Sequence, residues 1–218
     1  MLASVIFDLD GTLLDTLQDL ADASNQVLLN QNFPTHTTES YKLFVGQGLQ
    51  HLIKQIVPPG TDNRIVEKCR ADFEEIYSKI WNRNCCPYRG INDMLSALAK
   101  MGVRMGVLSN KPHSFTLPFT DEFFPNRPFE IVLGQREGFA RKPNPDVALD
   151  IAKVLGSTPE NTFFVGDSGV DMQTAANSGM RSIGVTWGFR TEAELIENGA
   201  ERIINHPKEL LNYVISPS

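Results

Sequence analysis

Apolar and polar positions along the chain predict an alternation of strands and helices with one long helical interruption. The first apolar run, residues 5–7, is β-branched or aromatic and carries no charge, which is typical of a buried strand. The expected strands are residues 5–7, 103–108, 130–133, 162–165, 182–185 and 203–204. Helices of about 10–15 residues would separate most of them, so the pattern predicts an α/β fold with a doubly wound, parallel, Rossmann-like sheet.

The interruption covers residues 15–84, where apolar side chains recur at helical spacing and no strand pattern appears. Asp15 is the expected N-cap of the first helix, and Gln18 would complete a capping box. The expected helices are residues 15–30, 38–45, 49–57 and 62–83. We therefore predict that residues 15–84 form a small inserted all-helical cap domain, and that residues 1–14 and 85–218 form the core.

Further helices are expected between and after the later strands. They cover residues 91–102, 144–156, 170–177, 191–198 and 207–214. Asn144 is the expected N-cap of the second of these, with Pro145 as its first helical residue. The segment after the second strand is weakly patterned, because Pro118, Pro125 and Pro128 break it.

Polar side chains follow four of the predicted strands at their carboxyl ends or in the loop beyond. They are Asp8 and Asp10, Ser109 and Asn110, Lys142, and Asp167 with Asp171. In an open α/β sheet the carboxyl ends of the strands line the ligand crevice. We therefore expect these side chains to meet at one edge of the sheet.

Asp8 and Asp10 lie two residues apart, so strand geometry would point both carboxylates the same way. Two like charges this close repel unless a cation neutralises them, and oxygen ligands favour a hard ion such as Mg²⁺. A strand followed by an aspartate-rich turn is the alternative for these two residues taken alone. Arrival of the other polar side chains at the same edge favours the metal site.

The chain resembles the haloacid dehalogenase-like hydrolase superfamily in four motifs, in both order and spacing. These motifs are Asp8-Leu9-Asp10-Gly11-Thr12, Ser109-Asn110, Lys142-Pro143 and Gly166-Asp167-Ser168-Gly169-Val170-Asp171. The helical insert resembles the C1-type cap of that superfamily. Leu108-Ser109-Asn110-Lys111-Pro112 and Gly46-Gln47-Gly48-Leu49 are most similar to the corresponding stretches of phosphoglycolate phosphatases.

This resemblance implies roles for the residues at the strand ends. Asp8 would be the nucleophile that forms an aspartyl-phosphate, and Asp10 would be the general acid and then the general base. Mg²⁺ would be held by the Asp8 carboxylate, the Asp10 carbonyl and Asp167. Asp171 would either bind the ion through water or orient Lys142.

Three further residues would act on the phosphate. Ser109 would donate a hydrogen bond, Asn110 would help through its backbone N–H, and Lys142 would shield the nucleophile from the incoming dianion. The resemblance thus implies a phosphatase acting on a small phosphorylated metabolite. A sugar phosphomutase similar to β-phosphoglucomutase, and a catalytically silent binding or regulatory protein on the same fold, are the alternatives.

Several polar or glycine residues have no assigned role. Gly46 and Gly48 would either place a cap loop over the active site or act as a helix C-cap and linker. Basic residues that could contact substrate from the cap or hinge are Lys42, His51 and Arg89. Residues 187–190 follow the fifth strand, where they would either pack or contact substrate.

Composition narrows the class of protein. The 218 residues carry a net charge of −6 and no run of Lys or Arg, which argues against a nucleic-acid partner. No apolar run approaches the ~20 residues needed to span a bilayer, and no signal peptide is recognisable. Cys69, Cys85 and Cys86 have neither disulfide-framework nor zinc-site spacing, so we expect free structural thiols in a cytoplasmic protein. The sequence does not indicate whether the protein is a monomer or a homodimer.

Overall fold

The computed structural model describes residues 3–126 and 128–214. Its larger part is a parallel sheet of six strands in the order β5-β4-β1-β6-β7-β8. The strands are β1 Ser4–Phe7, β4 Met105–Pro112, β5 Ile131–Gln135, β6 Thr162–Gly166, β7 Arg181–Val185 and β8 Arg202–Ile204. Chain order reverses direction between β1 and β6, so the switch point of the sheet lies beside the end of β1.

Strand β1 is buried on both faces, which explains why its sequence is continuously apolar. Val5 and Phe7 belong to the larger apolar cluster of the protein. Ile6, between them, points to the opposite face and joins a second cluster with Ala148 and Ile151.

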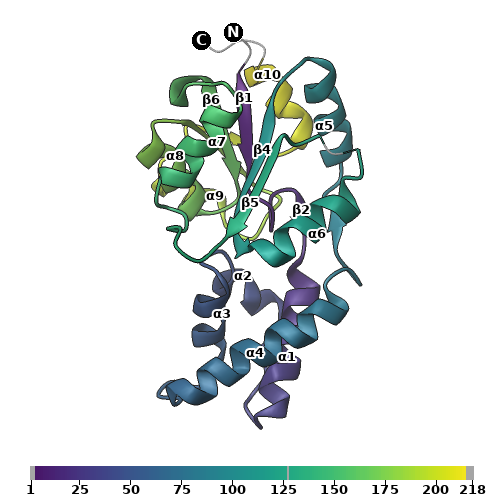
Figure 1. The fold of residues 1–218 in the computed structure, drawn as a ribbon, viewed down its shortest axis with the longest axis vertical. Coiled ribbons are helices and arrows are strands. Elements are labelled where there is room, and N and C mark those ends of the chain that lie inside the picture. The colour runs from purple at the N-terminus through teal and green to yellow at the C-terminus, as the bar shows by residue number, and fades with distance from the viewer. Residues whose placement is uncertain (1–2, 127, 215–218) are drawn as a thin grey trace.

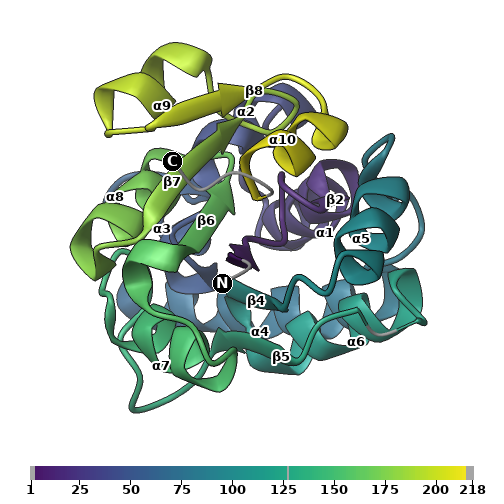
Figure 2. The same ribbon diagram turned by 90° about the horizontal axis from the view of Figure 1, so that it is seen from above.

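Helices cover both faces of the sheet (Figure 2), which confirms the predicted doubly wound α/β fold. On one face lie α5 Ile91–Lys100, α6 His113–Phe123 and, beyond the 3₁₀ turn Pro207–Leu210, α10 Leu211–Val214. On the other lie α7 Asp146–Val154, α8 Gly169–Ser178 and α9 Glu192–Glu197. No helix in the described ranges is long and apolar enough to cross a membrane.

Four helices form the smaller part of the molecule, below the carboxyl ends of the strands in Figure 1. They are α1 Leu17–Asn30, α2 Thr38–Phe44, α3 Leu49–Ile56 and α4 Asn63–Ile80. The chain passes into and out of them through β2 Leu14–Asp15 and β3 Cys86–Pro87, which pair antiparallel. We retain residues 15–84 as the proposed cap and residues 1–14 and 85–218 as the proposed core.

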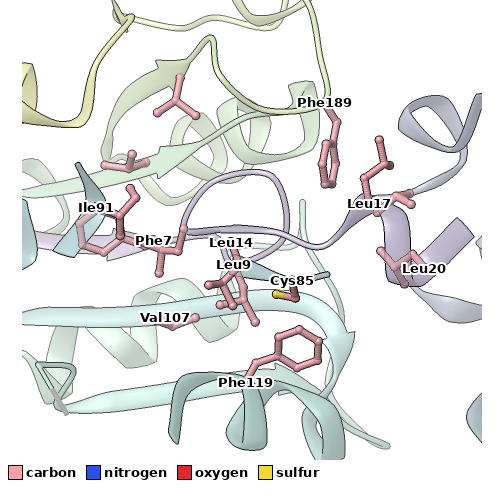
Figure 3. Packing of buried hydrophobic residues seen from close by; sticks show 14 of the residues in the cluster. Phe7, Leu9, Leu14, Leu17, Leu20, Cys85, Ile91, Val107, Phe119 and Phe189 are labelled. Carbon is pink, nitrogen blue, oxygen red and sulfur yellow. The ribbon is translucent and has the colours of Figure 1, made fainter. Parts of the chain in front are cut away.

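Apolar packing continues from the sheet across these two crossings. Phe7 and Leu9 lie close to Leu14 and Cys85, and the same cluster extends to Leu20 on α1 (Figure 3). Because Leu14 and Cys85 are buried in this cluster, the two connections hold the four helices over one edge of the sheet.

The beginning of α1 differs from the prediction. Thr16, not Asp15, is the N-cap, and its side chain makes no capping hydrogen bond. Asp15 instead belongs to β2, whose pairing keeps it extended, although its carboxylate still accepts from the Leu17 N–H at 3.3 Å. The predicted capping box is absent, since Gln18 donates to Asp22 at 2.7 Å.

Two later elements also differ. Helix α6 forms in the weakly patterned segment and contains Pro118, because its packing against β4 and β5 outweighs the local cost of a proline. Helix α7 begins one residue later than predicted, with Pro145 at the N-cap position. Asn144 still performs the expected capping, since its Oδ1 accepts from the Asp146 N–H at 2.9 Å.

Asp19 on α1 binds the segment that leads from α4 into β3. Its carboxylate is buried and accepts from the backbone N–H groups of Asn84 and Cys85 at 3.0–3.1 Å. The Asn84 side-chain amide also donates to it at 2.8 Å. A hydrophobic replacement would leave these donors without an acceptor.

We expect Asp19→Ala to lower the free energy of unfolding by about 2–4 kcal/mol, because buried donors would lose a charged acceptor. Urea denaturation measures this. Asp22→Ala, on the same helix but exposed, is the matched control and should change stability by less than about 0.5 kcal/mol. Equal effects of the two substitutions would contradict this role of Asp19.

Candidate active site

A cavity of about 650 Å³, including its open mouth, lies between the carboxyl ends of the strands and the four helices. Predicted site residues that line it are Asp8, Asp10, Ser109, Asn110 and Asp167. The other two, Lys142 and Asp171, are buried behind Asp8. The structure therefore brings all seven predicted side chains to one place.

Lys142 is the centre of the charge arrangement. Its Nζ lies 2.8 Å from Asp8 Oδ1 and 2.7 Å from Asp171 Oδ1, and the lysine side chain is 2% exposed. The second oxygen of Asp171 accepts from the Ser168 N–H at 3.1 Å and from the Ser168 hydroxyl at 2.6 Å. Asp171 thus starts α8 through a capping box and orients Lys142 with the same carboxylate.

Burial of these charges shifts their protonation. Desolvation raises the pKa of Asp8 from 3.8 to about 7, although Lys142 opposes the shift. Burial and the neighbouring Asp171 and Asp8 raise the pKa of Asp167 well above its ordinary value. Burial lowers the pKa of Lys142, but Asp171 and Asp8 outweigh burial, so the net shift is upward and the ammonium stays charged.

Two glycines enclose Asp167. A Cβ at Gly11 would lie 2.3 Å from Asp167 Oδ2, and one at Gly188 would lie 2.3 Å from Asp167 Cβ. The close approach lets the Phe189 N–H donate to Asp167 Oδ2 at 2.7 Å, while the Thr12 hydroxyl donates to Oδ1 at 3.3 Å. The sequence analysis placed Gly188 and Phe189 after the fifth strand, where they would pack or contact substrate, but it did not predict their contacts with Asp167.

The donor set of this site fits a divalent cation. Asp8, Asp167 and Asp171 each present an oxygen, and these three atoms lie within 4.8 Å of one another. Three carboxylates and the single ammonium of Lys142 would leave two excess negative charges when all are ionised. An all-oxygen site with this charge suits Mg²⁺, with Asp171 the least available ligand because it holds Lys142 and Ser168.

Lys111 is a site residue that the sequence analysis did not select. Its Nζ lies 3.1 Å and 3.3 Å from the two carboxylate oxygens of Asp10, and 3.0 Å from the hydroxyl of Tyr77 on α4. The ammonium also lies 4.5 Å from the ring centroid of Phe119. Asp10 is thereby linked, through Lys111 and Tyr77, to the helical part of the chain.

Asn110 connects the loops that carry the other residues. Its amide donates to the carbonyls of Gly46 at 3.0 Å and Lys142 at 3.1 Å, and its Oδ1 accepts from the Lys142 N–H at 2.9 Å. The side chain therefore has a positioning role that the sequence did not predict. Its predicted backbone contact with phosphate stays a prediction.

Comparison with known proteins assigns the family. Residues 5–185 match the model of the haloacid dehalogenase-like hydrolases. This chain belongs to that family. A phosphoglycolate phosphatase of Pseudomonas putida (strain KT2440) is 31% identical over 98% of this chain and 80% of its own. Phosphoglycolate phosphatase 1 of Pseudomonas aeruginosa (strain PAO1) is 31% identical over 95% of this chain and 78% of its own.

A crystal structure from Lactobacillus delbrueckii subsp. bulgaricus, provisionally assigned as a phosphoglycolate phosphatase, superimposes with a TM-score of 0.92. It is 31% identical and the match covers 98% of this chain and 99% of that one. The hydrolase is accordingly classed as a phosphoric monoester hydrolase.

The cap-loop glycines of the hydrolase face the cavity. Gly46 and Gly48 both line it and have positive φ angles of 111° and 86°. A Cβ at Gly48 would lie 3.4 Å from the Asn110 carbonyl, so the loop lies against the strand ends. This arrangement favours a loop over the site, although Gly48 also serves as the N-cap of α3.

The remaining open residues of the hydrolase lie elsewhere. Lys42 pairs with Glu39, and neither Lys42, His51 nor Arg89 lines the cavity described here. The cysteines of the described chain are free, as expected; Cys85 is buried at the crossing and Cys86 is exposed.

Without divalent cations, the free energy of unfolding of the hydrolase should fall as the pH rises from about 4 to about 7. Asp8 keeps a proton in the folded state up to about pH 7, whereas the unfolded chain releases it near 3.8. The folded state therefore binds more protons across this interval, and raising the pH favours unfolding. Urea denaturation in a chelating buffer measures the slope.

Asp8→Asn should reduce this slope and leave the part that Asp167 contributes through its own raised pKa, and saturating Mg²⁺ should stabilise the native protein most at the high end of the interval. Asp150→Asn, on the exposed face of α7, should leave the slope unchanged. A wild-type slope that survives Asp8→Asn unaltered would contradict the assignment of the proton to Asp8.

Lys111→Met should lower kcat by about 10–100-fold, because Asp10 would lose the cation that fixes its carboxylate. Steady-state kinetics with Mg²⁺ measure the effect. Lys100→Met, at an exposed position on α5, is the control. Full activity of Lys111→Met would show that Asp10 needs no fixed partner.

Proposed function

We propose that this hydrolase is a Mg²⁺-dependent phosphatase of a small phosphomonoester such as phosphoglycolate, acting through an aspartyl-phosphate. The observation that carries the proposal is the buried Asp8 carboxylate, which faces the cavity with Lys142 at 2.8 Å and Asp167 beside it. A carboxylate held in this way has the position of a nucleophile and the cationic support that an incoming phosphate dianion requires.

In the first step, Asp8 attacks phosphorus and the bond from phosphorus to the substrate oxygen breaks. Lys142 offsets the charge of the nucleophile, and Ser109 donates a hydrogen bond to a phosphate oxygen. Bound Mg²⁺ would neutralise charge on the phosphoryl group, with the Asp8 carboxylate, the Asp10 carbonyl and Asp167 as its proposed ligands.

Asp10 moves the protons in both steps. Its carboxyl group gives a proton to the departing alkoxide, which leaves as an alcohol. The resulting carboxylate then takes a proton from the water that attacks the aspartyl-phosphate, releasing inorganic phosphate and restoring Asp8. Lys111 holds the Asp10 side chain in place for these transfers, and the Tyr77 hydroxyl accepts a hydrogen bond from Lys111.

The substrate class rests on the relatives and on the cavity. The two curated relatives named above are phosphoglycolate phosphatases, and a cavity between the strand ends and the four helices suits a small metabolite better than a phosphoprotein. The helical cap would close over the bound ester and exclude bulk water from the acyl phosphate.

A panel of small phosphomonoesters with Mg²⁺, assayed by release of inorganic phosphate, tests the proposal. We expect release from phosphoglycolate, loss of release on exhaustive chelation, and a fall of at least about 10³-fold in Asp8→Asn. Asp150→Asn, which removes an equivalent charge from the surface, should retain activity. The nucleophile assignment is wrong if Asp8→Asn keeps full activity.

Other outcomes of the same panel identify the alternatives. Isomerisation of a hexose 1-phosphate without net phosphate release would favour the phosphomutase. No turnover of any ester would favour a binding protein. Unchanged release after chelation would remove Mg²⁺ from the proposal.

A further inference from the structure

Arg190 lies in the segment between β7 and α9, and it lines the cavity. Its side chain is 12% exposed. The roles proposed above for Asp8, Asp10 and Lys142 do not use it. A buried guanidinium in a substrate cavity needs an explanation, because an ion removed from water requires anionic or hydrogen-bonding partners.

Two of its three nitrogens have such partners. Nε lies 3.3 Å from a carboxylate oxygen of Glu194. Nη2 donates to the carbonyl of Val45 at 2.8 Å and more weakly to that of Leu43 at 3.4 Å, both at the end of α2. These contacts fix the plane of the guanidinium between the core and the cap loop.

The third nitrogen has no partner. Nη1 of Arg190 is buried and makes no hydrogen bond within residues 3–126 and 128–214. Leaving a charged donor buried and unpaired costs more than leaving a neutral one. The position therefore suits an acceptor that arrives with the substrate.

Like Arg190 with Glu194, the two lysines of the site have carboxylate partners, and the Nζ atom of each lysine is hydrogen-bonded. Lys142 contacts Asp8 and Asp171, and Lys111 contacts Asp10. Much of the remaining cavity wall is apolar and includes Leu20, Val45, Leu49, Leu52, Phe73 and Phe115. Arg190 is thus the lining cation whose unpaired donor can meet a second anionic group.

Arg190 is also close enough to the phosphate end to bind the same molecule. The backbone N–H of Phe189, its neighbour in the chain, donates to Asp167 at 2.7 Å, and Asp167 and Arg190 line the same cavity. The bonds of Arg190 to Val45 and Leu43 place it beside the cap loop, where the part of a substrate beyond the ester oxygen would lie.

We propose that Arg190 is a specificity-determining residue that binds a carboxylate on the substrate through Nη1. An N–H of that nitrogen can donate a charge-assisted hydrogen bond to a carboxylate oxygen. This inference rests on the proposed phosphatase function and names its substrate class: a phosphomonoester of a short hydroxy acid. A substrate of this class would contact core and cap loop at once.

The test compares two esters of similar size. Phosphoglycolate carries the carboxylate, and 2-hydroxyethyl phosphate replaces it with a neutral hydroxymethyl group. Wild-type enzyme should prefer phosphoglycolate by about 10–100-fold in kcat/KM, the value of one charge-assisted contact. Arg190→Met should lose that preference mainly through KM, with kcat/KM falling far more for phosphoglycolate than for the neutral ester.

Arg141→Met is the matched control. Arg141 also donates to the cap loop, to the carbonyl of Gln47 at 2.8 Å, but the residue is exposed. Its removal should therefore preserve the ratio between the two esters. Free glycolate should compete with 2-hydroxyethyl phosphate in wild type and in Arg141→Met, and far more weakly in Arg190→Met.

The outcomes separate this inference from the proposed function. Hydrolysis of neither ester by wild type would defeat the phosphatase proposal itself. Equal hydrolysis of both by wild type, or equal losses for both in Arg190→Met, would show that Arg190 only holds the cap loop. If Arg190→Met does not fold, the preference of the wild-type enzyme and the competition by glycolate still test the proposal. Arg190→Lys, which keeps the positive charge, should retain part of the preference.

Discussion

The candidate active site is organised around an excess of buried negative charge beside one lysine. Asp8 and Asp171 both contact Lys142, and Asp167 lies beside them with its own raised pKa. Such a cluster is unfavourable in isolation, because burial disfavours each ionised carboxylate and the carboxylates repel one another. The same cluster is favourable for an enzyme that must attract a divalent cation and then present a carboxylate to phosphate.

The fold holds these charges in place through the backbone. Strand β1 is buried on both faces and delivers Asp8 to the switch point of the sheet, where β6 delivers Asp167 from the neighbouring strand. Gly11 and Gly188 allow chain segments to approach Asp167 more closely than any side chain would permit. The charged atoms are therefore fixed by strands and turns, and little of their placement depends on flexible side chains.

The proposed cap contributes side-chain and backbone contacts to the site. Tyr77 contacts Lys111, which holds Asp10, while Asn110, Arg141 and Arg190 donate to cap-loop carbonyls. Each of these three donors is next in the chain to a residue of the site. Movement of the cap loop would therefore be transmitted to the phosphate site and to the proposed substrate carboxylate.

The sequence predicted those features that depend on local pattern. The apolar run of β1, the strand-to-turn acids and the long helical insert each have a short-range signal, and the parallel sheet follows from their alternation. The contacts of Lys111 and Arg190 could not be predicted, because each depends on how the cap packs on the core. Asp15 was misassigned for a related reason: its pairing partner, Cys86, is far along the chain. Helix α6 was missed because tertiary packing overrides Pro118.

The central claim is that the carboxylate of Asp8 receives the phosphoryl group. The most direct measurement is mass spectrometry of the enzyme after rapid acid quenching during turnover of phosphoglycolate with Mg²⁺. The account predicts a phosphoryl adduct on the peptide that contains Asp8, and none on that peptide from Asp8→Asn. Sustained turnover with no adduct at this aspartate, or with the adduct on another residue, would contradict it.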